Sequence, residues 1–479
     1  MADLPRFCVL RAGKEYDSLD TVELRHHRTK EPVAVVSQAN AGIIRRDLKK
    51  AHRHAATLRA MPIAERIERC QAAARIFLED TLPVAGDQTQ TVDEYVDALH
   101  STTGLPHALC RANMQKNALV LREMPTILAG LTRGMDPNVL DTGTGEHGGV
   151  GVWYTPSADA LGAILPSNSP GVHSLWIPSI ALGVPLALKP GREEPWTPMR
   201  IARAMMAAGF PPEAFSLYPT DHEGGATLLD SCERSLLFGD VSVTQKYAGD
   251  PRIEIHGPGR SKVLLGEDVV DDWESYLDVI VASVAANGGR SCVNSSALFV
   301  PRHGDAIAEA LAERMTAITP RAFDDPEATL AAFANPAFAE RMDAAIDAGL
   351  ASGAKDLSLA ARGGSPRRVE QDGATYLLPT VVRCNSLDHG LANTEFLFPF
   401  TSVVEVPQAD MLASIGPSLV VTAITRDEGF VRELTSSGDI HRLNLGPLPT
   451  SKVEWDQPHE GNLFEFLYAR RAFQQAAAW

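Results

Sequence analysis

One cysteine occurs in a setting that suits chemistry. Cys292 lies in the segment NGGRSCVNSS, residues 287–296, among glycines and small polar residues and directly after an apolar helical pattern. A cysteine that only fills a core usually has apolar neighbours. A thiolate, in contrast, is a strong nucleophile toward an electrophilic carbon at neutral pH. The segment therefore favours a reactive thiol, with an inert small residue as the alternative.

Three other polar side chains follow predicted strands or lie in loops. Asn168 lies in LPSNSPGVHSLW between a short strand and a helix, and Lys189 ends the strand in VPLALKP. Glu395 precedes the aromatic run of NTEFLFPF. Ligand-binding groups gather at such positions in open α/β sheets. Taken singly, Asn168 also suits a turn, Lys189 a surface strand end, and Glu395 an ordinary loop or helix cap.

The elements that must position these residues alternate along the chain from residue 160. LGAIL, VPLALKP, FSLYP, LLFG and IEIHG predict strands, and TPMRIARAMMAAG predicts a helix that ends at Gly209. This alternation predicts a parallel α/β sheet of the nucleotide-binding kind. A second α/β region begins near residue 262 with KVLLG and a long helical pattern.

Changes of pattern also predict the domain organisation. The expected units are an N-terminal extension (1–39), a nucleotide-cofactor-binding domain (40–132 and 156–256), a catalytic thiol domain (257–457) and oligomerisation segments (133–155 and 458–479). The stretch GTGEHG, residues 143–148, matches G-x-G-x-x-G but lacks the strand before it and the helix after it that a dinucleotide site needs, so we interpret it as a loop.

Bulk composition excludes several function classes. The 479 residues, with 44% hydrophobic and 22% charged residues, suit a soluble multidomain protein. The net charge of −16 argues against nucleic acid or an anionic membrane as partner. The basic run RRDLKKAHRH, residues 45–54, favours a solvated helix face over an anion site. We find no signal peptide, no spanning segment and no metal-binding spacing among six dispersed cysteines, so we expect a cytoplasmic protein without a metal.

The order and spacing of these segments resemble the aldehyde dehydrogenase superfamily over residues 40–470. PSNSP stands where members typically read P-W-N-F-P, KPGR where they read K-P-A-E, and EFLFPF where they read E-I-F-G-P-V. The Gly-x-x-Cys and YLLPT segments lie between them in register. The resemblance implies an α/β fold with a Rossmann-like cofactor domain, an α/β catalytic domain and a small oligomerisation hairpin and tail. It also implies NAD(P)-dependent oxidation of an aldehyde by a homodimer or homotetramer.

The resemblance assigns roles to individual residues. Cys292 resembles the nucleophile that forms a thiohemiacetal and then a thioester. Asn168 resembles the side-chain donor that, with the backbone N–H of Cys292, stabilises the oxyanion. Lys189 is similar to the lysine that holds the adenosine ribose, and Glu395 to the carboxylate that holds the nicotinamide ribose. Trp176 falls where members often place an aromatic wall of the substrate tunnel, with a core position as the alternative.

The segment HGPGRS, residues 256–261, departs from the family's E-L-G-G-K-S. His256 stands where members carry the glutamate that activates water to hydrolyse the thioester. Histidine is a competent base near neutral pH, so we expect His256 to take that role and the product to be a carboxylic acid. Relatives that pass the acyl group to coenzyme A also lack this glutamate, so coenzyme A is the alternative acceptor. A strand-end residue without a catalytic role is the third interpretation of His256.

The predicted cofactor site also departs from the family. Arg192 stands where many NAD-preferring members carry a glutamate, and an arginine attracts a 2′-phosphate that a glutamate repels. NADP is therefore favoured over NAD. Pro166 is assigned to the cofactor site with Gly239, which keeps the glycine of the family's F-T-G-S turn. Asp240 beside it is a poor neighbour for a pyrophosphate.

Two other classes of protein compete with the enzyme. A non-catalytic relative that keeps the fold as a binding protein would explain the unusual residues at 240, 256 and 398, although such decay has no reason to spare Cys292, Asn168, Lys189 and Glu395 together. An unrelated Cys–His hydrolase would not need the Lys-Pro turn or Glu395.

Overall fold

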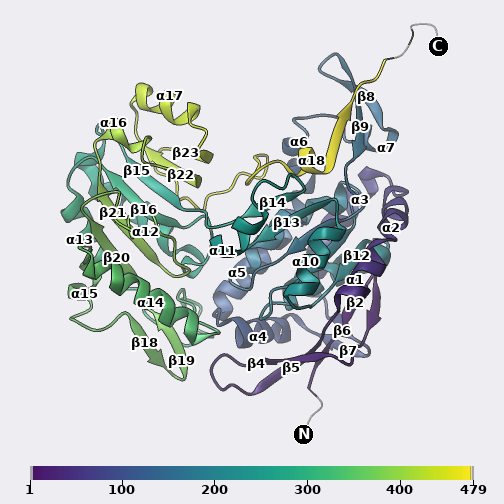
Figure 1. The fold of residues 1–479 in the computed structure, drawn as a ribbon, viewed down its shortest axis with the longest axis horizontal. Coiled ribbons are helices and arrows are strands. Elements are labelled where there is room, and N and C mark those ends of the chain that lie inside the picture. Colours follow the sequence, from purple (N-terminus) through teal and green to yellow (C-terminus); the bar gives the residue numbers. More distant parts are fainter. Residues whose placement is uncertain (1–3, 475, 477–479) are drawn as a thin grey trace.

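The computed structural model describes residues 4–474 and 476 of the chain. Two seven-stranded sheets form the centres of two lobes, and a three-stranded sheet projects from one of them (Figure 1). We call the part that carries the first large sheet, up to residue 256, the first lobe. The part that carries the second large sheet, from residue 257 to about 450, is the second lobe.

The sheet of the first lobe is parallel at its centre and antiparallel at one edge. Its strands, in spatial order, are β14 (Ile253–His256), β13 (Arg234–Phe238), β10 (Leu161–Ile164), β11 (Leu186–Lys189), β12 (Phe215–Leu217), β2 (Val9–Arg11) and β3 (Lys14–Tyr16). Short apolar runs without alternation form the parallel strands because helices bury both faces. The predicted parallel sheet is therefore confirmed.

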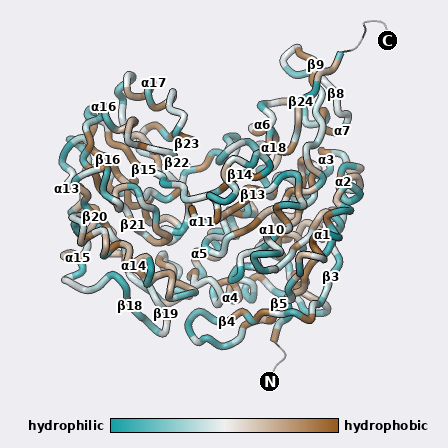
Figure 2. The backbone as a smooth tube through the Cα atoms, in the orientation of Figure 1, coloured by the Kyte–Doolittle hydropathy of each residue, from teal (hydrophilic) through white to brown (hydrophobic). Residues whose placement is uncertain are grey.

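The sheet of the second lobe is parallel except at β17. Its strands, in spatial order, are β17 (Lys355–Asp356), β20 (Thr380–Cys384), β21 (Phe400–Glu405), β16 (Ser295–Val300), β15 (Ser261–Leu265), β22 (Ser418–Ile424) and β23 (Ile440–Leu445). Successive residues of β15 point to opposite faces, so Leu264 packs in one hydrophobic cluster and Val263 with Leu265 in another. Hydrophobic segments concentrate on the strands inside each lobe (Figure 2).

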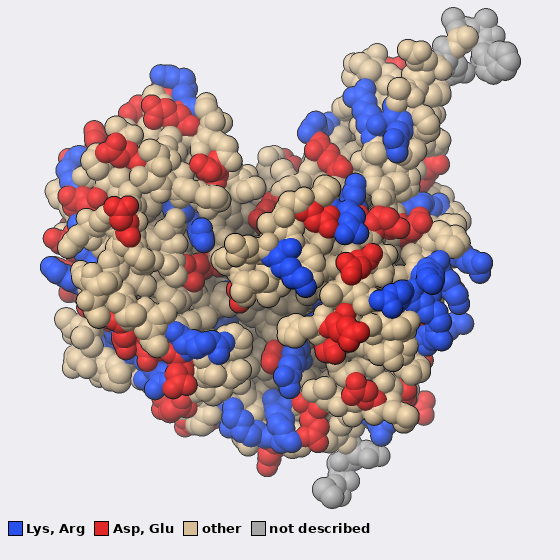
Figure 3. Space-filling view, in the orientation of Figure 1, with Lys and Arg blue, Asp and Glu red and all other residues tan. Residues whose placement is uncertain are grey.

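Helices cover both sheets. Those of the first lobe are α1 (Ala41–Leu48), α2 (Ala51–Arg59), α3 (Ile63–Glu79), α4 (Val92–Thr103), α5 (His107–Arg122), α6 (Met124–Leu131), α8 (Pro178–Ala181), α9 (Trp196–Ala207), α10 (His222–Ser231) and α11 (Val241–Thr244). Those of the second lobe are α12 (Leu277–Ala285), α13 (Gly304–Thr316), α14 (Pro336–Ala351), α15 (Leu357–Ala361), α16 (Gln408–Met411) and α17 (Glu428–Ser436). The basic run lies on α1 and α2 with exposed side chains (Arg45, Arg46, Lys49, Lys50 and Arg53), at the right edge of Figure 3.

The projecting arm joins two distant parts of the sequence. Strand β9 (Val150–Pro156) pairs with β8 (Thr144–His147) on one side and with β24 (Tyr468–Arg471) on the other. The helix α18 (Leu463–Leu467) precedes β24, and its Leu463, Phe464 and Leu467 are buried. GTGEHG therefore lies in a hairpin, away from any helix N-terminus. A notch separates the arm from the second lobe (Figure 3).

The N-terminal segment is not a separate extension. Strands β2 and β3 complete the first sheet, and β1 (Arg6–Phe7) and β5 (Pro32–Ser37) join β4 (Thr21–Arg25) in a small sheet of their own. The apolar residues Phe7 to Leu10 are buried in the core of the first lobe, which explains why this segment packs on it. Within the described residues, no helix is long and apolar enough to cross a membrane.

Candidate active site

Three neighbouring parallel strands bring the cysteine segment together with two others. Strands β15, β16 and β21 lie side by side in parallel, so the segments that precede them meet at one edge of the sheet. These segments are the turn before β15, the Cys292 loop before β16 and the Glu395 segment before β21. The sequence shows three separate motifs, and the topology makes them a single site.

Two glycines let these segments approach closely. A Cβ on Gly289 would lie 2.3 Å from the carbonyl carbon of Phe398, and Gly289 has a φ of +68°. A Cβ on Gly259 would lie 2.0 Å from the carbonyl oxygen of Cys292. Only glycine fits such contacts. The Ser261 hydroxyl then donates to the same Cys292 carbonyl at 2.9 Å.

Asn168 reaches the cysteine loop from the first lobe. It follows β10, and its side-chain amide donates to the carbonyl oxygen of Arg290 at 2.7 Å. Asn287 donates to the Ser169 hydroxyl at 2.9 Å and accepts from the Asn113 amide at 2.8 Å. Side chains of both lobes therefore fix the loop that carries the thiol next to the amide of Asn168.

Cys292 differs from the other five cysteines, which are all buried, because its side chain is partly exposed. Its thiol is nevertheless poorly ionised in this state. Burial, together with the charges of Glu395 and Glu460, raises the pKa of Cys292 to about 12, and Lys116 and a backbone hydrogen bond act in the opposite direction. The thiol therefore carries its proton at neutral pH and has to lose it for a nucleophilic attack.

Glu395 lies against the turn before β15. Its carboxylate accepts from the backbone N–H of Arg260 at 2.8 Å. Burial raises the pKa of Glu395 to about 7, and the backbone donors and Arg260 limit the rise. A carboxyl group with this pKa exchanges protons near neutral pH.

His256 has both ring nitrogens next to carboxylates, which the sequence does not predict. Its Nδ1 is hydrogen-bonded to Glu460 at 2.7 Å, and its Nε2 lies 3.1 Å from a carboxylate oxygen of Glu254. Burial lowers the pKa of His256, but the two carboxylates more than offset this and raise it to about 9. The ring also stacks on Phe238. The raised pKa favours the imidazolium at neutral pH, whereas the predicted role as a base needs the neutral ring, so that role stays a prediction.

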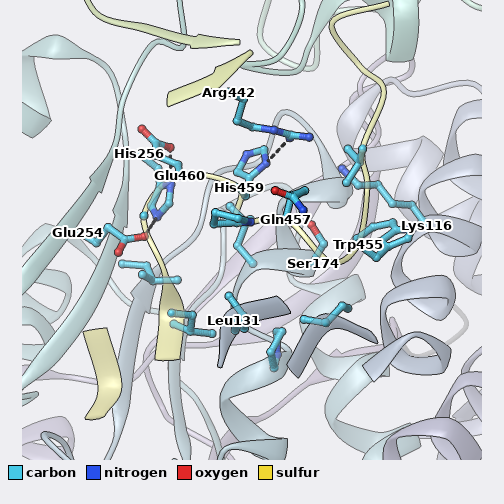
Figure 4. Close-up of a pocket in the computed structure, with 18 residues that line it drawn as sticks. Lys116, Leu131, Ser174, Glu254, His256, Arg442, Trp455, Gln457, His459 and Glu460 are labelled. Carbon is cyan, nitrogen blue, oxygen red and sulfur yellow. Dashed lines mark hydrogen bonds and ion pairs between the residues drawn. The ribbon is translucent and has the colours of Figure 1, made fainter. Parts of the chain in front are cut away.

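His256 lines a pocket between the lobes and the segment that leads to the arm (Figure 4). The cavity has a volume of about 80 Å³. Its polar lining residues are Lys116, Ser174, Glu254, His256, Arg442, Gln457, His459 and Glu460. Arg442 donates to Nδ1 of His459 at 3.0 Å, and burial with the nearby cations lowers the pKa of His459 well below its usual value. His459 is therefore a neutral imidazole.

Trp176 is a core residue and not a wall of this pocket. It is fully buried, and its indole N–H donates to Nδ1 of His173 at 3.0 Å. Nε2 of His173 lies 2.8 Å from Glu194, which also accepts from the backbone N–H of Thr197. The prediction of a tunnel residue is wrong because Trp176 points toward this buried network, while Ser174 and Leu175 face the cavity.

The predicted cofactor residues gather at the strand exits of the first lobe. Lys189 ends β11, and burial lowers the pKa of its partly exposed ammonium group. Within the described residues, the Lys189 ammonium forms no hydrogen bond or ion pair. Pro166 packs against Gly191, where a Cβ would lie 2.5 Å from the Pro166 carbonyl oxygen. Arg192 is exposed beside this turn.

Gly239 and Asp240 directly precede the short helix α11, and Asp240 is its N-cap. The Asp240 carboxylate accepts from the backbone N–H groups of Ser242 and Val243 at 2.9 and 3.2 Å. It therefore caps the donors that would otherwise face a phosphate. The exits of β10 and β11 suit the ribose side of a dinucleotide, whereas this turn does not present free donors to a pyrophosphate.

Three imidazoles outside the pocket could hold a metal ion. Ligand atoms of His26, His27 and His100 all lie within 4.8 Å of one another. Nδ1 of His27 is hydrogen-bonded to the carbonyl of Ser101 and Nδ1 of His100 to that of Leu105. The dispersed histidines carry no spacing signal, and sequence reasoning did not find this cluster.

Several pocket residues were also missed. Lys116 comes from α5, Arg442 from β23, and His459 and Glu460 from the segment before the arm. The only sequence signal was the apolar pattern of the C-terminal segment, which places it on the body of the protein but gives no role to its polar residues.

Comparison with known proteins supports the resemblance to aldehyde dehydrogenases. A model described as the aldehyde dehydrogenase family matches residues 14–415. A 2-aminomuconic 6-semialdehyde dehydrogenase of a Pseudomonas species is 24% identical over 78% of this chain and 75% of its own length. A betaine aldehyde dehydrogenase of Sinorhizobium fredii is 26% identical over 59% of this chain and 60% of its own length.

The fold agrees with solved structures. The NAD-dependent aldehyde dehydrogenase of Sinorhizobium meliloti has a TM-score of 0.78 and 19% identity over 97% of this chain and 94% of its own. The predicted α/β fold, with its Rossmann-like lobe and second α/β lobe, is thereby confirmed.

Proposed function

Because the chain belongs to the aldehyde dehydrogenase family, we propose that it oxidises an aldehyde to a carboxylic acid with NADP or NAD, through a covalent bond to Cys292. The observation that carries the proposal is the tether between the Asn168 amide and the loop of Cys292, the one cysteine with a partly exposed side chain. This arrangement supports the assignment of Cys292 as the nucleophile and of Asn168 as the oxyanion donor.

The first step forms a bond between the Cys292 sulfur and the carbonyl carbon. The thiol gives its proton to solvent water, its sulfur bonds to the carbonyl carbon, and the electron pair of the C=O double bond moves to the oxygen, which gives a thiohemiacetal oxyanion. An amide side chain has two N–H donors. One donor of Asn168 is used by Arg290, and the second, with the backbone N–H of Cys292, stabilises the oxyanion.

The residues at the strand exits would hold the cofactor. Lys189, whose ammonium group has no partner among the residues that the structure describes, would donate to the adenosine ribose. Glu395 would turn from Arg260 to accept from the nicotinamide ribose, and Pro166 and Gly239 would form the walls. When bound, the nicotinamide group supplies a hydride acceptor. The exposed Arg192 supports NADP as the preferred form, because a guanidinium binds a phosphate through charged hydrogen bonds.

The thioester on Cys292 then needs an acceptor for its acyl group. We keep water as the acceptor of the acyl group. We propose that the cluster of Glu254, His256 and Glu460 accepts the proton that this water loses. The carboxylates are the basic groups of this cluster at neutral pH, since the imidazole is protonated. His256 then positions Glu460 through the 2.7 Å hydrogen bond.

The protonated state of His256 also supports the second candidate, transfer to coenzyme A. An enzyme that transfers the acyl group to a thiol does not need a base for water. A single turnover with excess aldehyde and cofactor separates the two. Release of the carboxylic acid without coenzyme A supports hydrolysis, and a thioester that persists until coenzyme A is added establishes acyl transfer.

We further propose a homodimer or homotetramer that pairs through the arm. Strand β8 leaves one edge of the three-stranded sheet open, and the apolar side chains Val150 and Trp153 are 53% and 36% exposed. An open strand edge with exposed apolar residues suits pairing with another chain. A monomer mass in light scattering at micromolar concentration would refute this proposal.

The decisive experiment follows absorbance at 340 nm with a panel of aldehydes, with NAD or NADP, and with or without coenzyme A. Aldehyde-dependent formation of the reduced cofactor supports the oxidation. Its absence with every aldehyde, in protein that is folded and loaded with cofactor, favours the non-catalytic relative.

A further inference from the structure

We propose that the aldehyde accepted by this pocket carries a carboxylate at the end remote from its carbonyl group, and that Lys116 and Arg442 bind this carboxylate. The inference rests on the proposed function. It deepens that function by naming the chemical class of the substrate.

The pocket contains two cations without an anionic partner. Within residues 4–474, neither Lys116 nor Arg442 forms an ion pair with a carboxylate, and both are partly buried. Burial lowers the pKa of each, which means that the environment opposes their charge. Because an uncompensated charge away from water is costly, an anionic ligand would relieve both residues.

Every carboxylate that lines the pocket is already paired. Glu460 and Glu254 both contact His256, at 2.7 and 3.1 Å. With His459 neutral, the five charged side chains of the pocket are three cations and two anions. The cluster of Glu254, His256 and Glu460 carries a net charge of −1, so one of the two positive charges of Lys116 and Arg442 has no counterpart in the pocket lining.

The two kinds of charge occupy different sides of the pocket. In Figure 4 the cluster of Glu254, His256 and Glu460 lies on the left, whereas Lys116 lies on the right and Arg442 above. A carboxylate bound at Lys116 would therefore lie on the side of the pocket away from that cluster.

Arg442 has free donors for a carboxylate. A guanidinium has five N–H donors. One N–H of Arg442 donates to His459 at 3.0 Å and one to the carbonyl of Lys452 at 3.2 Å. These contacts orient the group and leave three donors, and a guanidinium binds a carboxylate best through two of them.

The remaining lining of the pocket suits a hydrocarbon chain. Apolar side chains, among them Ile127, Leu131, Leu175 and Trp455, cover much of the cavity wall. A hydrocarbon chain against this wall, with a carboxylate at the cations, matches both parts of the pocket.

The cations also act on the nucleophile. Lys116 lowers the pKa of Cys292, and the Cys292 thiolate raises that of Arg442. Lys116 also lies near the turn that follows Asn168. A Cβ on Gly171, in this turn, would be 3.4 Å from the ammonium nitrogen of Lys116. The charge that would bind the carboxylate is therefore near both the thiol and the oxyanion donor.

The test compares three aldehydes of similar length: 4-oxobutanoate, neutral butanal and cationic 4-(trimethylammonio)butanal. We expect kcat/KM to be highest for 4-oxobutanoate and lowest for the cation. In Lys116→Met and in Arg442→Met, the ratio of kcat/KM between 4-oxobutanoate and butanal should fall at least about 30-fold, the effect of removing one partner of a buried charge pair. Both substrates use the same thiol, so the ratio cancels any change in Cys292.

The exposed Lys50→Met is the matched control and should keep the wild-type ratio. A wild-type preference for butanal, or a ratio that is unchanged in both pocket variants, would overturn the inference while the oxidation itself stands. If no aldehyde is oxidised, the proposed function fails, and thermal stabilisation by succinate still tests the pocket. Succinate should raise the Tm of the wild type and of Lys50→Met but not of the pocket variants, and equal shifts in all four proteins would overturn the inference.

Discussion

The side-chain amide of Asn168 donates to the carbonyl oxygen of Arg290 at 2.7 Å, two residues before Cys292. This bond orients the amide and leaves its second N–H for another acceptor. The carbonyl of Arg290 is itself held, because the buried guanidinium of the same residue donates to the carbonyls of Thr103 and Ala332. An oxyanion donor is effective when it is fixed before the reaction begins.

The first prediction concerns this donor. Asn168→Ala should lower kcat and kcat/KM together by about 100- to 1000-fold, because the lost interaction acts in the transition state. The KM for the cofactor should change little. Steady-state kinetics with the exposed Asn335→Ala as control tests this. A change in the KM for the aldehyde alone would reassign Asn168 to substrate positioning.

A second prediction concerns the nucleophile. Cys292→Ala should abolish aldehyde oxidation and leave the circular dichroism spectrum and the cofactor affinity unchanged. Cys384→Ala removes a buried thiol of the same lobe and should keep most of the activity. Activity of Cys292→Ala above a tenth of the wild-type value would exclude the thiohemiacetal mechanism.

The reactivity of this thiol should follow the charges around it. Glu395 raises the pKa of Cys292 and Lys116 lowers it. At pH 8, iodoacetamide should therefore alkylate Cys292 faster in Glu395→Gln and more slowly in Lys116→Met. Peptide mass spectrometry gives the rate for each cysteine. The exposed Glu428→Gln should match the wild type, and a slower reaction in Glu395→Gln would contradict the electrostatic account.

The state of His256 predicts a pH dependence of stability. Its pKa is about 9 in the folded protein against a usual value of 6.5. The contribution of the imidazolium is therefore complete below pH 6.5 and is lost as the pH rises through about 9. The free energies of unfolding of the wild type and His256→Gln, measured in urea, should converge over this range. A difference that stays constant from pH 6.5 to 9.5 would mean that His256 is not charged.

Cofactor choice depends on Arg192. The wild type should use NADP at least as well as NAD, and Arg192→Glu should shift the ratio of kcat/KM toward NAD, because a carboxylate repels a 2′-phosphate. Arg6→Glu, at another exposed position of the first lobe, is the control. An unchanged ratio in Arg192→Glu would show that this side chain does not contact the ribose.

Much of the fold could be predicted from the sequence because it depends on local patterns. The apolar runs that predict β10, β11 and β13 have the length of buried strands, and the helix predicted to end at Gly209 is α9, which ends at Ala207. The predicted order of strand and helix also suffices to place Asn168 and Lys189 at strand exits. These features need only neighbours along the chain.

The remaining features of the site depend on contacts that local patterns do not encode. The charge of His256 depends on Glu254, two residues away, and on Glu460, which is 204 residues away and gives no local signal. Lys116 lies on a helix where a lysine is an ordinary residue, and only the tertiary structure brings it near Arg442. The family resemblance predicts Trp176 in the substrate tunnel. In the structure, Ser174 faces the cavity and Trp176, two residues later, points into the core.

The thiol precedes β16 of one lobe, and its oxyanion donor follows β10 of the other. Catalytic activity would therefore depend on the contact between the two lobes, and a folded state of each lobe alone would not be enough. Sub-global opening, in which the lobes separate while each keeps its secondary structure, costs less free energy than complete unfolding. In mild denaturant the protein would pass through a form that has native circular dichroism but no activity, and gentle dilution would restore turnover without any refolding of a sheet.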